Sequence, residues 1–369
     1  MKILLFEEFS GVHKNLKQGL LALGYTDVTI AGTGSGWRKI PGDVSLGRTR
    51  SRNPVRVAQR LAAPFLKMKR LTGHDVVQFM GPYFFARRSL QGLNGALMRR
   101  LIKGNASSFL VACGCSSRYL NAVRKLDYSP CPSCAALDTE GGHCLYDGET
   151  RGAWDAEFAS TVDAIIPIGY EYALSYEGCP NLKPIIPLPI NTAGIECAEN
   201  KVKGRLVVFH GLNRAGFKGT RIIENALKRL KERYPNDIEA VIEGRLPLAD
   251  YLVLLSRANI VIDQCFSYSY GMNAVYAMAM GKVVFSGAED KAVEAMGLGA
   301  CPVVNIRPDE DDIMRKIESF LKDRGRVAEV GRVSRQYVED NHDSVKVAGR
   351  YLEVWKSVLS GEKSRLSVR

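Results

Sequence analysis

The sequence predicts an α/β fold made of two doubly wound, Rossmann-like units. The chain opens with a strand, an amphipathic helix and a second strand within residues 2–31, which together form a βαβ unit. A second α/β unit starts at Arg205, directly after the polar linker 200–204. With 369 residues, of which 46% are hydrophobic, the chain is long enough to bury two cores.

In the first unit, apolar runs alternate with helical patterns, as is typical of a parallel sheet. The strands are expected at residues 2–6, 28–31, 75–79, 109–112, 164–168 and 184–187. The first helix carries leucines at positions 16, 20, 21 and 23 and ends at Gly24.

The second unit begins with a segment, Val207 to Thr220, that reads as a strand, a glycine turn and a helix entrance with two cations, Arg214 and Lys218. A helix N-terminus attracts anions through its free N–H groups and its dipole. A guanidinium and an ammonium group strengthen that attraction. The segment therefore predicts a diphosphate-binding loop. Further elements are expected at residues 222–230, 238–242, 248–256, 259–264, 283–285, 313–321 and 345–359.

A glycine-started helical pattern follows the strand at residues 259–264. It resembles a motif in the C-terminal half of retaining GT-B glycosyltransferases, the family-4-like enzymes of bacterial surface polysaccharides. The matching positions are Gly271, Ala274, Ala277, Met278, Ala279, Gly281 and Val283. Arg214 and Lys218 match the basic pair of that family, and the resemblance extends weakly over the whole chain.

The resemblance implies a GT-B fold, in which two Rossmann-like domains face a cleft. Residues 1–195 would form an acceptor-binding domain, residues 205–340 a nucleotide-sugar-binding domain, and residues 341–369 a crossover helix and tail. It further implies an enzyme that moves a sugar from a nucleotide-sugar donor to a lipid-linked polysaccharide acceptor with retention of configuration. No cofactor is expected to be required for this reaction.

The resemblance also suggests site residues. The donor would be bound by Gly11, Asn213, Arg214, Lys218, Gly219, Glu243, Gly271, Met272, Asn273 and Tyr276. His13 and Tyr268 would take part in catalysis, with His13 at the acceptor, and a loop histidine that is bonded locally is the alternative interpretation of His13. Tyr268 and Tyr276 stand where the family has two glutamates eight residues apart, and Cys113 stands where it often has a histidine. A tyrosine can hydrogen-bond to a ligand but carries no negative charge.

Cysteines gather in an insertion near residues 113–144. The candidate metal ligands there are Cys113, Cys115, Cys131, Cys134 and Cys144. A C-x-C pair, a C-x-x-C pair and a further cysteine could supply a tetrahedral zinc site. Such a zinc would be structural, and reduced thiols in an insertion loop are the alternative interpretation.

Positive charge is concentrated in the first half of the chain. Residues 36–125 contain 18 lysines and arginines and only two acidic residues, Asp43 and Asp75. Basic residues surround an apolar helical pattern at 55–65, which suits an anionic membrane surface, although a solvated basic face is the alternative. Because no apolar run could span a bilayer and the N-terminus turns acidic at once, we expect a cytoplasmic protein, peripheral at the inner face of the membrane.

Two other functions stay open. A catalytically silent GT-B protein that binds a partner enzyme or a glycan is the first, because both family glutamates are replaced. A basic, zinc-containing nucleic-acid-binding protein ranks last, because the sequence lacks the alternation of aromatic and basic residues that single-strand platforms use.

Overall fold

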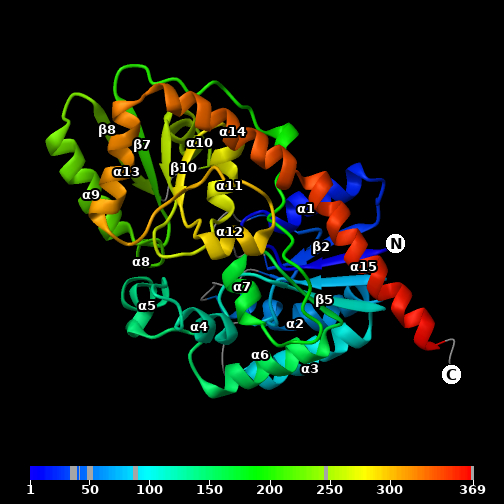
Figure 1. The fold of residues 1–369 in the computed structure, drawn as a ribbon. Helices are drawn as coiled ribbons and strands as arrows, with labels where there is room; N and C mark the ends of the chain where they lie inside the picture. The colour runs from blue at the N-terminus through cyan, green and yellow to red at the C-terminus, as the bar shows by residue number, and fades with distance from the viewer. Residues whose placement is uncertain (34–39, 41, 48–52, 86–89, 245–247, 367–369) are drawn as a thin grey trace.

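Two lobes, each built on a parallel sheet flanked by helices, make up the protein (Figure 1). The computed structural model describes residues 1–33, 40, 42–47, 53–85, 90–244 and 248–366. Parts of the basic stretch 36–125 lie outside these residues. The predicted α/β class, with two doubly wound sheets, is confirmed.

The N-terminal lobe contains a six-stranded parallel sheet in the order β3-β2-β1-β4-β5-β6. β1 lies between β2 and β4, so Ile3 pairs with both Val28 and Val76. The chain reverses its direction of winding there, and ligands bind at such a reversal, beyond the carboxyl ends of the strands. The strands are β1 (Ile3–Phe6), β2 (Val28–Gly32), β3 (Val44–Ser45), β4 (Val76–Phe79), β5 (Ser107–Ala112) and β6 (Ala164–Pro167).

The C-terminal lobe contains a five-stranded parallel sheet in the order β11-β10-β9-β7-β8. Its reversal point lies between β7 and β9, so the carboxyl ends of these two strands border the second half of a ligand crevice. The strands are β7 (Leu206–Leu212), β8 (Ile238–Gly244), β9 (Ile260–Ile262), β10 (Val283–Ser286) and β11 (Val304–Asn305).

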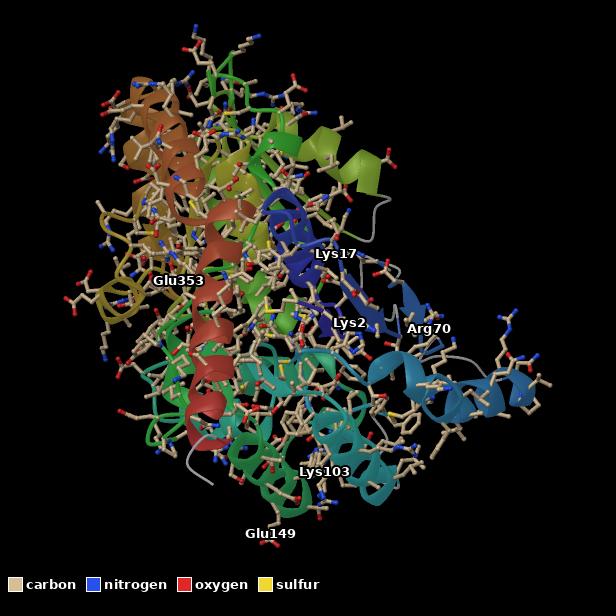
Figure 2. The ribbon with its side chains drawn as sticks, turned by 90° about the vertical axis from the view of Figure 1, so that its right-hand side faces the viewer. Lys2, Lys17, Arg70, Lys103, Glu149 and Glu353 are labelled. Carbon is tan, nitrogen blue, oxygen red and sulfur yellow. The ribbon has the colours of Figure 1, made fainter. Side chains whose placement is uncertain are left out.

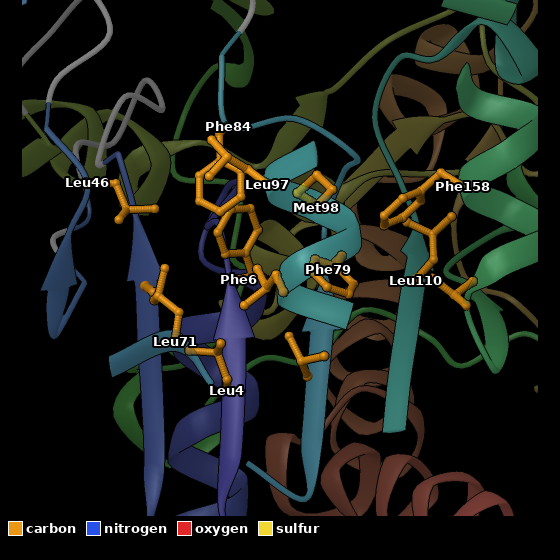
Figure 3. Close-up of a cluster of buried hydrophobic side chains, with 14 of the residues drawn as sticks. Leu4, Phe6, Leu46, Leu71, Phe79, Phe84, Leu97, Met98, Leu110 and Phe158 are labelled. Carbon is orange, nitrogen blue, oxygen red and sulfur yellow. The ribbon is translucent and has the colours of Figure 1, made fainter. Parts of the chain in front are cut away.

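Helices cover both faces of the first sheet. One face packs against α2 (Pro54–Leu71), α3 (Gln91–Lys103) and α6 (Glu149–Thr161), and Figure 3 shows Leu97 and Met98 of α3 lying over Phe6 and Phe79. The opposite face packs against α1 (Val12–Ala22). Because both faces are covered, the strands are apolar along their length rather than alternating.

The chain returns to the first lobe at its end. α14 (Gly325–Asn341) packs on the C-terminal lobe, and α15 (Ser344–Leu366) then runs along α1 (Figure 1). Trp355 of α15 is fully buried, and its indole N–H donates to Oε1 of Gln78 in β4 at 3.2 Å. α15 therefore ties the two lobes together.

The remaining helices connect the strands or form the insertion between β5 and β6. The insertion contains α4 (Ser117–Val123), α5 (Cys131–Asp138) and a 3-10 turn (Glu140–Gly142). The others are α7 (Tyr170–Ser175), α8 (Ala215–Lys218), α9 (Thr220–Arg233), α10 (Leu248–Arg257), α11 (Met272–Ala279), α12 (Asp290–Met296) and α13 (Glu310–Lys322).

Two local expectations are wrong. Residues 184–187 form no strand, because the prolines at both ends have no N–H to donate to a ladder. The expected glycine turn at Gly211 is still part of β7, and a short helix, α8, follows it. Among the described residues, no helix is both long and apolar enough to cross a membrane.

Candidate active site

A cleft of about 640 Å³ lies between the two lobes. It opens at the carboxyl ends of β1, β4, β5 and β9, where both sheets reverse their winding. Its N-terminal wall includes Glu7, Thr33, Tyr83, Tyr119, Arg151, Glu171, Tyr172 and Tyr176. Its C-terminal wall includes Arg214, Phe217, Gln264, Ser269, Tyr270, Gly271 and Met272.

Glu7 follows β1 directly and lines this cleft. Its backbone has a φ of 66°, a left-handed conformation that is uncommon and costly for a residue with a side chain. Burial raises the pKa of its carboxyl group to about 7, against hydrogen bonds from the N–H and the hydroxyl of Thr33. A carboxyl group in this state can exchange a proton near neutral pH.

Arg214 is the basic residue of the predicted diphosphate loop that lines the cleft. Its guanidinium carbon lies 4.0 Å from the centre of the Phe217 ring, a cation–π contact. One of its nitrogens lies 3.2 Å from the sulfur of Cys134 in the insertion. The guanidinium therefore lies where the insertion of the N-terminal lobe meets the C-terminal lobe, and it can reach an anion in the cleft.

Lys218 is not placed at the cleft surface. Its ammonium group is buried and lies 3.0 Å from Oδ1 of Asp263, which follows β9. Asp263 Oδ1 also accepts a hydrogen bond from the amide of Asn273 at 3.2 Å. The structure thus corrects the expected arrangement, because Lys218 and Asn273 form a buried network beneath the start of α11 instead of lining the cleft.

The start of α11 faces the cleft as expected. Gly271 and Met272 both line it, and Gly271 is the N-cap residue of this eight-residue helix. Backbone N–H groups at a helix start can donate hydrogen bonds to phosphate oxygens. Tyr276 lies one turn further along, where it packs half-buried against the apolar core. Gly271 and Met272 are therefore the part of the predicted motif that the structure brings together with Arg214.

The loop after β1 differs from the expectation. His13 is fully buried, and its ring nitrogens lie 2.6 Å from the carbonyl oxygen of Glu7 and 3.2 Å from the amide of Gln78. The N–H of Gly11 donates to the carboxylate of Glu8 at 2.7 Å. Neither Gly11 nor His13 lines the cleft, so the structure corrects their expected position facing Arg214.

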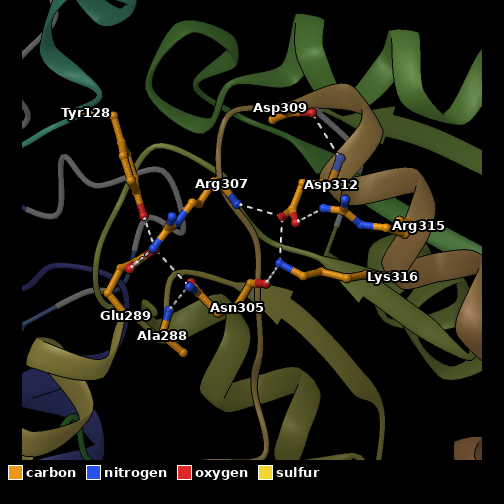
Figure 4. A network of polar contacts seen from close by, with 9 residues as sticks. All are labelled: Tyr128, Ala288, Glu289, Asn305, Arg307, Asp309, Asp312, Arg315 and Lys316. Carbon is orange, nitrogen blue, oxygen red and sulfur yellow. Dashed lines mark hydrogen bonds and ion pairs between the residues drawn. The ribbon is translucent and has the colours of Figure 1, made fainter.

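Tyr268 joins the two lobes instead of facing the cleft. Its side chain is 1% exposed, and its hydroxyl donates to Oδ2 of Asp127 in the insertion at 2.9 Å. A second interlobe contact lies beside it, where the Tyr128 hydroxyl donates to Glu289 at 2.7 Å (Figure 4). The guanidinium of Arg307 holds the pKa of Glu289 at about 2. This position corrects the expected catalytic place of Tyr268.

Three further predicted donor residues lie away from the cleft. Asn213 is exposed at the end of β7. Glu243 is exposed near the end of β8, next to α9. Gly219 has a φ of 74°, and a Cβ there would lie 2.3 Å from the sulfur of Cys265. The glycine is therefore required for packing within the lobe.

The cysteines of the insertion form two unequal parts. The thiol of Cys113 lies 3.8 Å from the carbonyl oxygen of Met80, apart from the others. Burial, followed by the neighbouring thiols of Cys115 and Cys144, raises the pKa of Cys131 to about 12. Within the part of the chain that the structure describes, no three His, Cys, Asp or Glu side chains are grouped so that they could hold a metal ion. This arrangement adds no support for a structural zinc, which stays a prediction.

Sequence reasoning missed the charged residues of the N-terminal wall. Glu7, Arg151 and Glu171 all line the cleft and are buried. An acidic residue directly after the first strand was a usable signal for Glu7. Glu171 lies in the first turn of α7, soon after β6, so its place near a strand end was a weaker signal of the same kind. No comparable local pattern marks Arg151, which lies within α6.

No protein-family model and no curated protein sequence matches the chain. Solved structures, in contrast, do match the chain. HepE from Anabaena, in complex with UDP and glucose, is 13% identical with a TM-score of 0.59, over 97% of this chain and 100% of HepE. Sucrose-phosphate synthase from Thermosynechococcus elongatus is 13% identical with a TM-score of 0.61, over 98% and 100% of the two chains.

A third structure widens the comparison. UDP-GlcNAc 2-epimerase from Neisseria meningitidis, bound to UDP-GlcNAc, is 11% identical with a TM-score of 0.50, over 97% of this chain and 100% of the epimerase. At such low identities the comparisons establish the fold and not the reaction. The chain therefore has the two-domain GT-B fold seen in glycosyltransferase structures.

Proposed function

We propose that this protein is a glycosyltransferase that moves a sugar from a nucleotide-sugar donor to a hydroxyl group of a glycan acceptor. The observation that carries the proposal is the interlobe cleft, which brings Arg214 and the start of α11 opposite buried carboxyl groups of the other lobe. One wall suits a diphosphate, and the other suits hydroxyl groups.

The donor diphosphate would lie against the C-terminal wall. Arg214 would pair with its oxygens, and the N–H groups of Gly271 and Met272 would donate to them. HepE was also solved with UDP-glucose, and the 2-epimerase was solved with UDP-GlcNAc. These complexes support a UDP-linked sugar as the donor of this chain too.

The reaction would retain the configuration of the sugar. The bond between the anomeric carbon and the phosphate oxygen breaks, and the acceptor oxygen bonds to that carbon from the same face. The acceptor proton passes to the leaving phosphate oxygen. Arg214 and the α11 amides would stabilise the charge on the leaving diphosphate, and Glu7 would orient the acceptor hydroxyl.

The acceptor would be a lipid-linked polysaccharide intermediate at the inner face of the membrane. α2 stands out from the body of the molecule (Figure 2), and its exposed face combines Phe65 and Leu66 with Lys69 and Arg70. Leu66 is 80% exposed. Apolar side chains beside basic ones suit the boundary between anionic headgroups and acyl chains.

Turnover of a panel of nucleotide sugars tests the proposal. Purified protein is incubated with UDP-, GDP-, ADP- and dTDP-linked sugars and simple glycan acceptors, and release of the nucleoside diphosphate is measured. We expect one donor to be consumed, with slow hydrolysis when no acceptor is present. NMR of the product then gives the anomeric configuration. An absence of turnover with every donor would contradict the proposal.

A catalytically silent binding protein is the second candidate. Two observations favour it, because Lys218 is paired with Asp263 inside the lobe and the Tyr268 hydroxyl is bonded to Asp127. Tight binding of a nucleotide sugar without consumption, by a protein whose folding is verified, would select this candidate. A nucleic-acid partner remains the least favoured interpretation.

A further inference from the structure

Glu171 has an unusual place in the cleft. It lies in the first turn of α7, in the N-terminal lobe, and is only 4% exposed. Its Oε1 accepts hydrogen bonds from the backbone N–H groups of Tyr268 at 2.7 Å and Ser269 at 2.9 Å, both in the C-terminal lobe. One carboxylate oxygen is thus fixed by the opposite lobe.

The second oxygen of Glu171 has no partner. Oε2 is buried and makes no hydrogen bond. A buried carboxylate oxygen without a donor is unfavourable, because it has lost its water and gained nothing in return. Since Glu171 lines the cleft, the missing donor can come from a ligand there.

The surroundings of Glu171 indicate which ligand fits. Tyr119 and Tyr172 are stacked with their ring centres 5.2 Å apart, and both line the cleft beside it. Aromatic faces that present apolar surface, next to a carboxylate oxygen that can only accept a hydrogen bond, suit the C–H faces and hydroxyl groups of a sugar.

The position of Glu171 indicates that this sugar is the donor sugar and not the acceptor. Ser269, which holds Oε1, is two residues before Gly271, the N-cap residue of α11. A sugar attached to a diphosphate at the start of α11 would therefore lie close to Oε2.

We infer that Glu171 is a specificity residue whose Oε2 accepts a hydrogen bond from a hydroxyl group of the donor sugar. The inference rests on the proposed function. It also gives the carboxylate a dual role, because the same side chain bridges the lobes through Oε1. A donor sugar is thereby recognised only when the two lobes are closed upon each other.

Two ligands and two variants separate these roles. The nucleotide sugar that binds best in a panel is titrated calorimetrically, followed by its free nucleoside diphosphate. Glu171→Gln keeps an oxygen for the amides of Tyr268 and Ser269 and removes the negative charge. Tyr128→Phe removes another interlobe hydrogen bond, to Glu289, that lies outside the cleft.

We expect Glu171→Gln to weaken the nucleotide sugar by about tenfold to a hundredfold, the range of a hydrogen bond to a charged group. The free nucleoside diphosphate should bind this variant within about twofold of the wild-type affinity, a small change on this scale. Tyr128→Phe should change both affinities by the same factor.

Several outcomes would overturn the inference. The inference is overturned if Glu171→Gln binds both ligands with unchanged affinity. It is also overturned if the variant loses the same affinity for both ligands, because the residue would then act only by closing the lobes. Sugar binding that requires added Mg²⁺ or Mn²⁺ and loses that requirement in Glu171→Gln would also overturn it, because Oε2 would then be a metal ligand.

If no nucleotide or nucleotide sugar binds the wild type, the proposed function itself fails. If Glu171→Gln does not fold, the conservative Glu171→Asp, with its shorter reach, replaces it with the same expectations.

Discussion

The Nζ of Lys218 lies 3.0 Å from Oδ1 of Asp263 in the interior of the C-terminal lobe. The two side chains are 8% and 4% exposed, so the pair is shielded from water. Asn273 and Ser286 add hydrogen bonds to the same carboxylate. The pair lies beneath the start of α11, and breaking it should lower the free energy of unfolding of the lobe.

Replacing Lys218 by methionine should therefore be costly. The substitution leaves a buried carboxylate without its partner, and such a loss costs about 3–5 kcal/mol. The free energy of unfolding, measured with urea, gives the effect. The matched control is Lys201→Met, which breaks an exposed pair with Glu199 and should cost at most about 1 kcal/mol. Similar losses in both variants would contradict the structural role of the Lys218 pair.

Glu7 makes the stability of the N-terminal lobe depend on pH. Its pKa is raised from 4.5 to about 7, mainly by burial, so the folded protein binds its proton more tightly than the unfolded chain does. This contribution is fully present below pH 4.5 and is lost as the pH rises through 7.

Relative to the wild type, Glu7→Gln should gain stability between pH 5 and pH 8, by up to about 3 kcal/mol. Urea unfolding at the two pH values measures the difference. Glu157→Gln, at an exposed position, is the control and should show no such gain. Glu8 has a similarly raised pKa and stays unchanged in both variants, so its effect cancels. A gain on going to lower pH would contradict the assignment.

Gly216 allows the insertion to reach the diphosphate loop. A Cβ at this position would lie 2.3 Å from the carbonyl oxygen of Ser133 and 3.0 Å from the Cβ of Leu137, both in α5. Asp138 meanwhile accepts hydrogen bonds from the backbone N–H groups of Gly216 and Phe217. These contacts hold α5 against α8.

Gly216→Ala should push α5 away from α8 and cost about 1–3 kcal/mol, as overpacking does. Limited proteolysis should then cut the insertion faster. Gly152→Ala is the matched control, because this helical glycine has open space around its Cα, and its substitution should be neutral or slightly stabilising. Equal proteolysis rates for the two variants would argue against the contact.

α2 provides the test of membrane association. Leu66→Glu places a negative charge on its exposed apolar face and should lower binding to vesicles that contain phosphatidylglycerol several-fold. Cosedimentation at low and high salt measures the binding. Val253→Glu, on an exposed position of α10 in the other lobe, should bind as the wild type does. Binding that is insensitive to Leu66→Glu would remove α2 as the membrane-facing surface.

The sequence was sufficient to predict the fold class and most elements. The period of the apolar residues gave β1, α1 and β2 and, much later in the chain, α9 and α15 with Trp355 on its buried face. These elements follow from local patterns, since the spacing of apolar residues within each segment shows its type and its buried face. The strand expected at 184–187 failed because an apolar run rich in proline satisfies hydropathy without satisfying hydrogen bonds.

The candidate site was predictable only in part. Arg214, Gly271 and Met272 reach the cleft because they lie in, or directly after, loops that follow strand ends, which topology places there. A motif placed Lys218 and Tyr268 at the cleft. In the structure Lys218 pairs with Asp263, and the Tyr268 hydroxyl donates to Asp127, and both partners are distant in the sequence. Such pairings depend on how the lobes and the insertion pack, and no local pattern encodes them.

The cleft should bind a nucleoside diphosphate through Arg214. Isothermal titration of UDP, GDP, ADP and dTDP into the wild type, Arg214→Ala and Arg205→Ala measures this directly, since Arg205 is an exposed arginine of the same lobe that pairs with Glu239. We predict that one nucleotide binds the wild type and Arg205→Ala equally and binds Arg214→Ala about tenfold or more weakly. Equal binding to all three proteins, or no binding of any of the four nucleotides to the wild type, would contradict a diphosphate site at Arg214.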